Sequence, residues 1–257
     1  MIQGLESMRR LRIIPCLQLK DETLVKTCQF KTPQYIGDPV QIIHSFNEKS
    51  VDELIILDIQ ATIQQRKPNL KFIAGIVNEC SMPVMYGGGI HSLEDIKNIV
   101  SIGVEKVILN SYAAGDAQSV NTAAEQVGSH RVVVSMDVKK NFFGKYEVWT
   151  HSGTITTRLH PVEYAVRMER MACGELFLNS IDRDGTRQGY DLDLIRQVSE
   201  AVSIPVIACG GAGNSSDIIE AFEMSGASAI AAGSMFFYDE KRRTISLSFP
   251  PLHELHT

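Results

Sequence analysis

The stretch MPVMYGGGIHSLEDI at residues 82–96 is the strongest indication of the fold, because a similar stretch occurs later in the chain. The second version, IPVIACGGAGNSSDI at residues 204–218, follows about 122 residues later. Each copy predicts a short buried strand that ends in glycines and is followed by the start of a helix. A strand, a glycine turn and a helix make one β/α unit, so we expect similar units to recur along the chain.

Two further pairs of segments repeat at nearly the same spacing. DELIILDI, from Asp52, resembles GELFLNSI, from Gly174, and IGVEKVILNS resembles SGASAIAAGS. Three matches at one offset indicate a chain made of two similar halves. We expect these half-barrels to cover about residues 12–125 and 130–240.

Eight short apolar runs are the candidate strands, with helix-like segments between them. They cover residues 11–19, 54–59, 83–88, 106–111, 131–138, 176–181, 204–211 and 228–234. Runs that are apolar nearly throughout suit strands buried on both faces of a parallel sheet. Eight alternations predict an α/β fold, a single (β/α)8 TIM barrel domain over residues 1–257. A doubly wound sheet is disfavoured because no GxGxxG follows the first strand.

Local signals place several elements. DPVQIIHSFNEKS, at residues 38–50, starts a helix with Asp and Pro, and SLEDIKNIVSIG and SSDIIEAFEMSG open with Ser and end at Gly. Residues 141–157 alternate with period two. This alternation predicts a hairpin in an extended loop after the fifth strand.

Composition argues against several classes of function. The net charge of −5 and the lack of a basic block make nucleic acid an unexpected partner. No run of eighteen apolar residues predicts a membrane span, and the N-terminal MIQGLESMRR lacks the apolar region of a secretion signal. Five cysteines without CxxC spacing suit a reduced, cytoplasmic protein. No cluster of His, Cys and carboxylates has ligand spacing, so we expect no metal and no cofactor.

Two glycine-rich strand ends predict a pair of phosphate sites. The candidate residues are Gly88, Gly89, Asn110 and Ser111 in the first half and Gly210, Gly211, Gly233 and Ser234 in the second. Glycines let the backbone approach an anion, and free amides at helix starts bind it. Two such sites across a barrel mouth suit a ligand with a phosphate at each end. The alternative is that these glycines only form tight strand exits.

Polar residues at other strand ends are candidates for chemistry. Asp137 ends the fifth strand, where a carboxylate can act as general acid or base or can cap a loop. Its counterpart by the half-repeat is Gln18, and an amide cannot exchange a proton near neutral pH. Further candidates for binding phosphate or hydroxyl groups, or for capping a turn or lying in solvent, are Lys26, Asp184, Gly185 and Thr186.

Four charged residues precede apolar runs and therefore belong at the opposite, N-terminal ends of the strands. They are Arg12, Glu53, Lys106 and Glu175. Two acids and two bases there either form a closed ring, in which each charge has a partner, or are unrelated surface charges. Spacing alone leaves both readings open.

The motifs IIPCL-LKD, GDPV, GGGI, GVEKV-LNS, SIDRDGT--GYD and IPVIA-GGAG together resemble the HisF family, the cyclase subunit of imidazole glycerol phosphate synthase. The resemblance covers about residues 12–235. It implies a half-repeated barrel that binds a ligand with two phosphates and receives ammonia from a HisH-like glutaminase docked on its N-terminal face. It also implies that the four charged residues form an ammonia gate and that Asp137 is one of two catalytic aspartates.

This chain departs from the family at the second aspartate, which matches Gln18, and in its tail. MFFYDEKRRTISLSFP, at residues 235–250, ends in a β-like run where the family has a closing helix. Both features are similar to a branch of the family that works with a glutaminase and a sugar amidotransferase on acetamidino sugars of surface polysaccharides. The first hypothesis is therefore an ammonia-conducting barrel in such a system. A working cyclase of histidine biosynthesis and a scaffold that holds a phosphorylated ligand are the alternatives.

Overall fold

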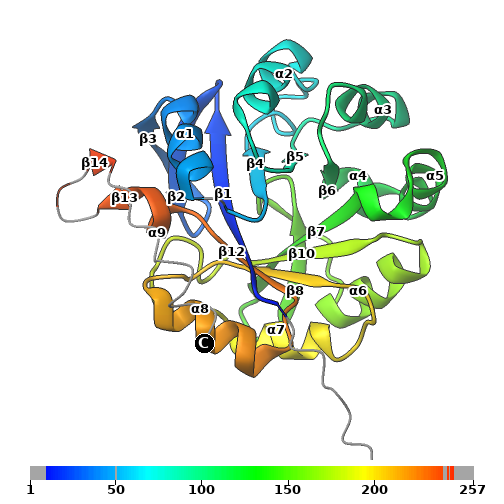
Figure 1. Ribbon diagram of the computed structural model, residues 1–257. Helices are drawn as coiled ribbons and strands as arrows, with labels where there is room; N and C mark the ends of the chain where they lie inside the picture. Colours follow the sequence, from blue (N-terminus) through cyan, green and yellow to red (C-terminus); the bar gives the residue numbers. More distant parts are fainter. Residues whose placement is uncertain (1–9, 50, 240–241, 243, 246–257) are drawn as a thin grey trace, which may run out of the picture.

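Eight parallel strands close into a barrel, and this confirms the fold predicted from the sequence. In order around the barrel they are β1 (Arg12–Lys20), β4 (Leu54–Asp58), β5 (Val84–Gly87), β6 (Lys106–Leu109), β7 (Val132–Lys140), β10 (Glu175–Ser180), β11 (Val206–Cys209) and β12 (Ala229–Ala232). Pairing of β12 with β1 completes the ring. The computed structural model, shown in Figure 1, describes residues 10–49, 51–239, 242 and 244–245.

Helices surround the barrel, as Figure 1 shows. They are α1 (Pro39–Lys49), α2 (Leu70–Glu79), α3 (Leu93–Ser101), α4 (Ser111–Gly115), α5 (Gln118–Val127), the 3-10 helix η1 (Ser129–Arg131), α6 (Pro161–Arg170), α7 (Leu192–Ser199), α8 (Ser215–Ser225) and α9 (Ser234–Phe237). Each longer helix buries one apolar stripe; in α1 this stripe includes Ile42, Ile43 and Phe46. Among the described residues, no helix is long and apolar enough to cross a membrane.

Side-chain caps set two helix starts that the sequence signals. Ser92 accepts a hydrogen bond from the Asp95 amide at 3.1 Å, so α3 begins where expected. For α8 the cap is Asn214 rather than the expected Ser215, because Asn214 and Asp217 form a reciprocal capping box. The prediction was therefore right about the helix and wrong by one residue about its cap.

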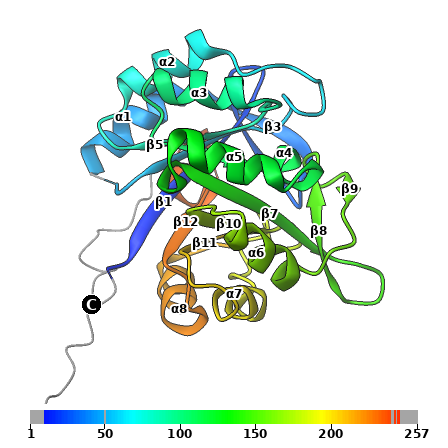
Figure 2. The same ribbon diagram turned by 90° about the vertical axis from the view of Figure 1, so that its right-hand side faces the viewer.

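Two hairpins extend from the C-terminal ends of the barrel strands. The first, β2 (Thr23–Cys28) with β3 (Lys31–Gly37), follows β1 and was not predicted. The second forms because β7 continues beyond the barrel and pairs with β8 (Tyr146–Thr150), which also pairs with β9 (Ile155–Thr156). The hairpin predicted within residues 141–157 is thus present as β8 and β9, and β7 adds a third strand to it. In Figure 2 β8 and β9 lie on the side opposite the N-terminal start of β1.

The described part of the tail contains a short strand pair. After α9, β13 (Tyr238–Asp239) pairs with β14 (Thr244–Ile245). The β-like run expected near the end of the chain starts in β14, and its remainder at residues 246–250 lies outside the described residues.

The inside of the barrel is filled by one apolar cluster. It consists of Ile14, Cys16, Ile55, Met85, Ile108, Val133, Phe177, Ile207, Cys209, Ala229 and Ala231. A separate and larger cluster fills the space between the strands and the helices. The inner cluster, here called the apolar layer, separates the polar groups at the two ends of the barrel.

Candidate functional site

The four charged residues at the N-terminal end form a closed ring, here called the charged ring. Arg12 Nη1 lies 3.2 Å from Glu53 Oε1, and Arg12 Nη2 also pairs with Glu175 Oε1. Lys106 Nζ lies 3.1 Å from Glu53 Oε2 and 3.0 Å from Glu175 Oε2. Each acid therefore contacts both bases, and the structure rules out four unrelated surface charges. The acids are the more buried members of the ring, since the Glu175 side chain is 4% exposed and the Arg12 side chain 27%.

Asp137 lies at the C-terminal mouth, where the sequence places it. It is buried on β7, and its Oδ2 accepts a hydrogen bond of 3.1 Å from Asn110 Nδ2. Burial, with a contribution from the nearby Asp184 carboxylate, raises the pKa of Asp137 to about 7, while a hydrogen bond with Ser135 opposes this. A carboxyl group in this state can release or take up a proton near neutral pH.

Gln18 is linked to a second buried acid through a threonine hydroxyl. Thr27 Oγ1 lies 3.1 Å from Gln18 Oε1 and 2.8 Å from Asp184 Oδ2. The Thr27 hydroxyl has one proton and can donate it to only one of these two oxygens. The other contact is a hydrogen bond only if Asp184 is protonated and donates to Thr27, or if the Gln18 amide is turned so that its nitrogen donates to Thr27. Burial raises the pKa of Asp184 to about 6, against the lowering effect of its hydrogen bonds with Thr27 and the Phe30 backbone.

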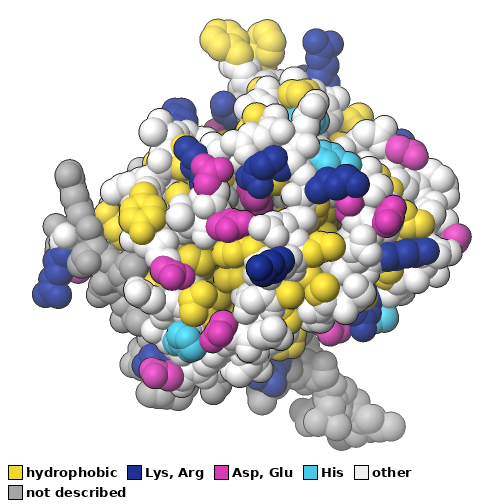
Figure 3. Space-filling model, turned by 90° about the horizontal axis from the view of Figure 1, so that it is seen from above, with side chains coloured by type: hydrophobic (Ala, Val, Ile, Leu, Met, Phe, Trp, Pro, Cys, Tyr) yellow, Lys and Arg dark blue, Asp and Glu magenta, His cyan; other side chains and the backbone are white. Residues whose placement is uncertain are grey.

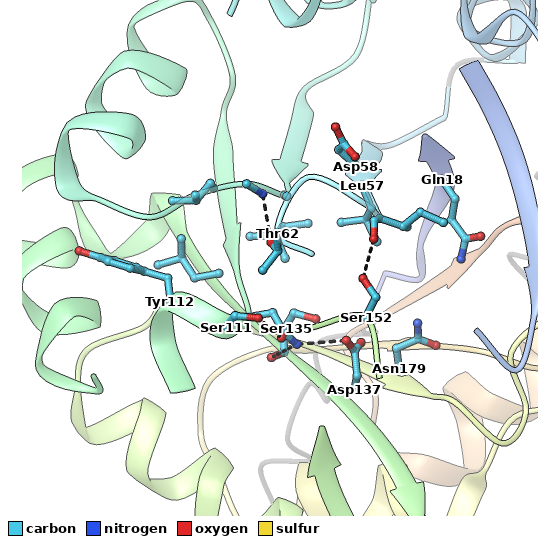
Figure 4. Close-up of a pocket in the computed structure, with 18 of the residues that line it drawn as sticks. Gln18, Leu57, Asp58, Thr62, Ser111, Tyr112, Ser135, Asp137, Ser152 and Asn179 are labelled. Atoms are coloured by element: carbon cyan, nitrogen blue, oxygen red, sulfur yellow. Dashed lines mark hydrogen bonds between the residues drawn. The ribbon is translucent and has the colours of Figure 1, made fainter. Parts of the chain in front are cut away.

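The mouth contains a cavity with an empty volume of about 820 Å³, its open side included. Figure 4 shows Asp137 and Asn179 beside each other, with Gln18 across the cavity on β1. Asn179 is 3% exposed, and its Oδ1 has no hydrogen-bond partner among the described residues. The loop between β8 and β9 borders this cavity, because Ser152 Oγ donates to Ile59 O at 2.6 Å.

The first pair of predicted phosphate-binding glycines lines this cavity together with Asn110 and Ser111. Gly88 has a φ of +119°, and a Cβ there would lie 2.4 Å from Asp58 O, so a side chain is not accommodated. The Gly89 amide donates to Thr62 Oγ1 at 3.2 Å. A phosphate that uses this amide would therefore displace the Thr62 hydroxyl.

A second cavity, with an empty volume of about 540 Å³, adjoins the first through the shared residues Gln18, Thr27 and Asn179. Of the residues selected from the sequence, the following line this second cavity: Lys26, Asp184, Gly185, Gly210, Gly211, Gly233 and Ser234. Thr186 does not line it: the Thr186 hydroxyl donates to Arg183 O at 2.8 Å, which is the turn-capping role left open by the sequence.

Two polar residues at the centre of the mouth, Thr27 and Asn179, were not selected from the sequence. Thr27 lies in the unpredicted hairpin after β1. Asn179 interrupts the apolar run LFLNSI at the C-terminal end of a barrel strand, and that position was a usable signal. Among the described residues, no group of three or more His, Cys, Asp or Glu side chains is arranged to hold a metal.

Comparison with known proteins identifies the family. The profile of the family described as "Histidine biosynthesis protein" matches residues 12–242. A Pseudomonas aeruginosa protein with the provisional name imidazole glycerol phosphate synthase subunit hisF2 is 47% identical over 248 residues, covering 96% of this chain and 99% of the relative. The chain belongs to the HisF family. Relatives named HisF subunit of the same synthase from Saccharolobus solfataricus and Alkaliphilus metalliredigens are 42% and 40% identical over 229 residues, covering 89% of this chain and 91% of each relative.

The raised pKa of Asp137 in this HisF barrel predicts a pH-dependent stability. Between about pH 4 and pH 7 Asp137 keeps its proton in the folded chain and loses it in the unfolded chain, so its contribution to the free energy of unfolding falls as pH rises. Asp137→Asn removes this term, up to about 1.4 kcal/mol per pH unit in that window. Urea unfolding at pH 5 and pH 8 will therefore show a smaller pH dependence in the variant. The exposed Asp193 provides the control Asp193→Asn; equal slopes for wild type and Asp137→Asn would contradict the prediction.

Proposed function

We propose that this HisF barrel conducts ammonia in a glutamine-dependent amidotransferase system that forms acetamidino sugars for surface polysaccharides. The observation that carries the proposal is the combination of an intact charged ring with Gln18 at the opposite mouth. The ring suits an entrance that faces a HisH-like glutaminase, and the amide removes one of the two groups that ring closure needs.

The charged ring would act as the gate. Its four ion pairs close the barrel, so ammonia enters only when a pair separates. Lys106 Nζ contacts both glutamates, so movement of this one side chain breaks two of the four pairs. Beyond the ring, the side chains of the apolar layer fill the barrel interior. Small displacements of these side chains would let ammonia pass to the mouth.

At the mouth, the carboxyl groups of Asp137 and Asp184 suit ligand binding and proton uptake more than imidazole formation. Asp137 is held by Asn110, and Gln18 can accept or donate a hydrogen bond without changing its charge. The two adjoining cavities suit a ligand with two phosphate groups or a nucleotide-linked sugar.

A working cyclase of histidine biosynthesis is the second candidate, and one observation favours it. Asp184 is a buried acid in the same hydrogen-bonded group as Gln18, so the mouth still contains two carboxyl groups. If Asp184 performs the missing proton transfer, the barrel converts the bis-phosphorylated formimino ribonucleotide and ammonia to imidazole glycerol phosphate and aminoimidazole carboxamide ribonucleotide.

The wild-type chain tests the choice between these functions. Supplied with the formimino ribonucleotide and ammonium at alkaline pH, it is expected to form little or no imidazole glycerol phosphate. Mixed with a HisH-like glutaminase and a sugar amidotransferase, it is expected to support glutamine-dependent amidine formation. Robust cyclisation would overturn the proposal in favour of the cyclase. Ligand binding without either reaction would support the third hypothesis, a scaffold that holds a phosphorylated ligand.

A further inference from the structure

Exposed hydrophobic side chains gather on one side of this molecule. Among the described residues the large ones are Tyr35, Ile63, Phe142, Phe143, Ile155 and Met224. Only Met224 lies on an outer helix; the other five lie in segments that follow β1, β4 or β7 at the C-terminal ends of these strands. The exposed large apolar side chains other than Met224 therefore lie in the segments at the mouth end of the barrel.

The most exposed pair is at the tip of the hairpin between β7 and β8. Phe142 is 98% exposed and Phe143 is 82% exposed. Their ring centroids are 5.6 Å apart in an edge-to-face arrangement, so the rings contact each other and little else. In Figure 3 hydrophobic side chains project at the top edge of the molecule beside a basic one. Aromatic side chains in such positions are typical anchors of protein interfaces.

The hairpin tip is held in one shape by its own hydrogen bonds. Asn141 Oδ1 accepts from the amides of Phe143 at 2.9 Å and Lys145 at 3.1 Å. The Asn141 side-chain nitrogen donates to Glu147 Oε1 at 2.8 Å, and the Asn141 amide donates to Lys145 O at 2.8 Å. A projection that is already ordered loses little conformational entropy when it binds, which favours a docking role.

Basic side chains accompany the aromatic pair. Lys139 and Lys140 belong to β7, and Lys145 is the last residue of the hairpin tip before β8. The first two place their ammonium groups over the rings of Trp149 and Tyr146, at 5.4 Å and 4.8 Å from the ring centroids. A surface of this kind is complementary to an apolar cleft with acidic residues at its border.

The position of the hairpin indicates which protein would carry such a cleft. β7 carries Asp137 in the mouth and continues without a break to Lys140, so a protein that holds the tip lies at the mouth end of the barrel. Under the proposed function, the protein that must meet the mouth is the enzyme that accepts the ammonia. An anionic membrane is a weaker match, because the whole chain carries a net charge of −5.

We propose that the hairpin tip, residues 141–145, docks the ammonia-accepting enzyme by inserting Phe142 and Phe143 into an acid-bordered apolar cleft. This inference rests on the proposed function, since it names the partner that completes the same site. The glutaminase would then bind the charged-ring end, and the acceptor the mouth end.

The test uses the double variant Phe142→Ser/Phe143→Ser, with Met224→Ser as the matched control for loss of an exposed apolar side chain. The probe is the purified sugar amidotransferase from the same organism, and calorimetry measures its binding to the full chain. We expect the double variant to bind at least about 10-fold more weakly than wild type and Met224→Ser to bind like wild type. Glutamine-dependent amidine formation should fall with binding, whereas the rate with ammonium chloride should stay unchanged.

The other outcomes separate a failure of the docking inference from a failure of the proposed function. Equal binding by wild type and the double variant, or no binding by either, overturns the docking inference. If glutamine-dependent amidine formation persists in that case, the proposed function stands. Binding that depends on the two rings but gives no amidine formation keeps the docking site and overturns the function. Ring-dependent sedimentation with phosphatidylglycerol vesicles, or ring-dependent self-association, without ring-dependent enzyme binding overturns the inference in favour of a lipid surface or a second copy.

Discussion

Gln18→Asp is expected to form imidazole glycerol phosphate from the formimino ribonucleotide and ammonium about 100-fold to 10,000-fold faster than the wild-type chain, because it restores a proton-transfer group. The new carboxyl group would lie across the mouth from Asp137, and the two could then divide acid and base roles. Product formation at alkaline pH, measured as initial rates for both proteins, provides the comparison.

Gln18→Asn is the matched control for this experiment. Asparagine has the shape of aspartate but cannot ionise, so it separates the effect of side-chain length from that of proton transfer. The expected order of rates is Gln18→Asp well above both Gln18→Asn and wild type. Equal rates for the Asp and Asn variants would show that the amide is not what limits cyclisation. A further replacement of Asp137 by Asn in the Gln18→Asp protein should remove the gained activity.

Lys106→Ala is the second change for which we expect a large effect. It leaves Glu53 and Glu175 close together with only Arg12 between them, and breaking buried ion pairs of this kind typically lowers the free energy of unfolding by about 3–5 kcal/mol. Because the Lys106 side chain is 17% exposed, we expect a value near the lower end of that range, about 3 kcal/mol. The variant should also lose coupling between glutamine hydrolysis and ammonia delivery. Denaturant unfolding and a coupled transfer assay measure the two effects.

A surface ion pair on the same end of the barrel provides the control for Lys106→Ala. Arg10 Nη2 lies 2.8 Å from Asp52 Oδ1, but the Arg10 side chain is 77% exposed. Arg10→Ala should therefore change the free energy of unfolding by no more than about 1 kcal/mol. Binding of a phosphorylated ligand at the mouth should be unaffected in both variants. Equal losses of ligand binding and ammonia transfer in Lys106→Ala would argue against a gate.

The sequence predicted the barrel because eight separate apolar runs alternate with helix-like segments, three of which carry helix start or stop signals. It also selected Asp137 and both glycine pairs, since strand ends converge in a parallel barrel. Spacing alone could not choose between a charged ring and unrelated charges, because Arg12 and Glu175 are far apart along the chain and their strands, β1 and β10, are not neighbours in the sheet. The role of Thr27 was hidden for a related reason: its contacts depend on the hairpin after β1, which has no regular apolar alternation.

The apolar layer acts on any nitrogen species that crosses the barrel. A cation would have to shed its hydration shell among side chains such as Ile14, Val133 and Phe177, at far greater cost than neutral ammonia. Under the proposed function, this interior would admit neutral ammonia and exclude ammonium ions, as the apolar core of a lipid bilayer does. A crossing molecule leaves its proton at one end and regains one at the other. In the proposed function, transfer would therefore carry no net charge, and its rate would rise with pH as the unprotonated fraction of the ammonia pool increases.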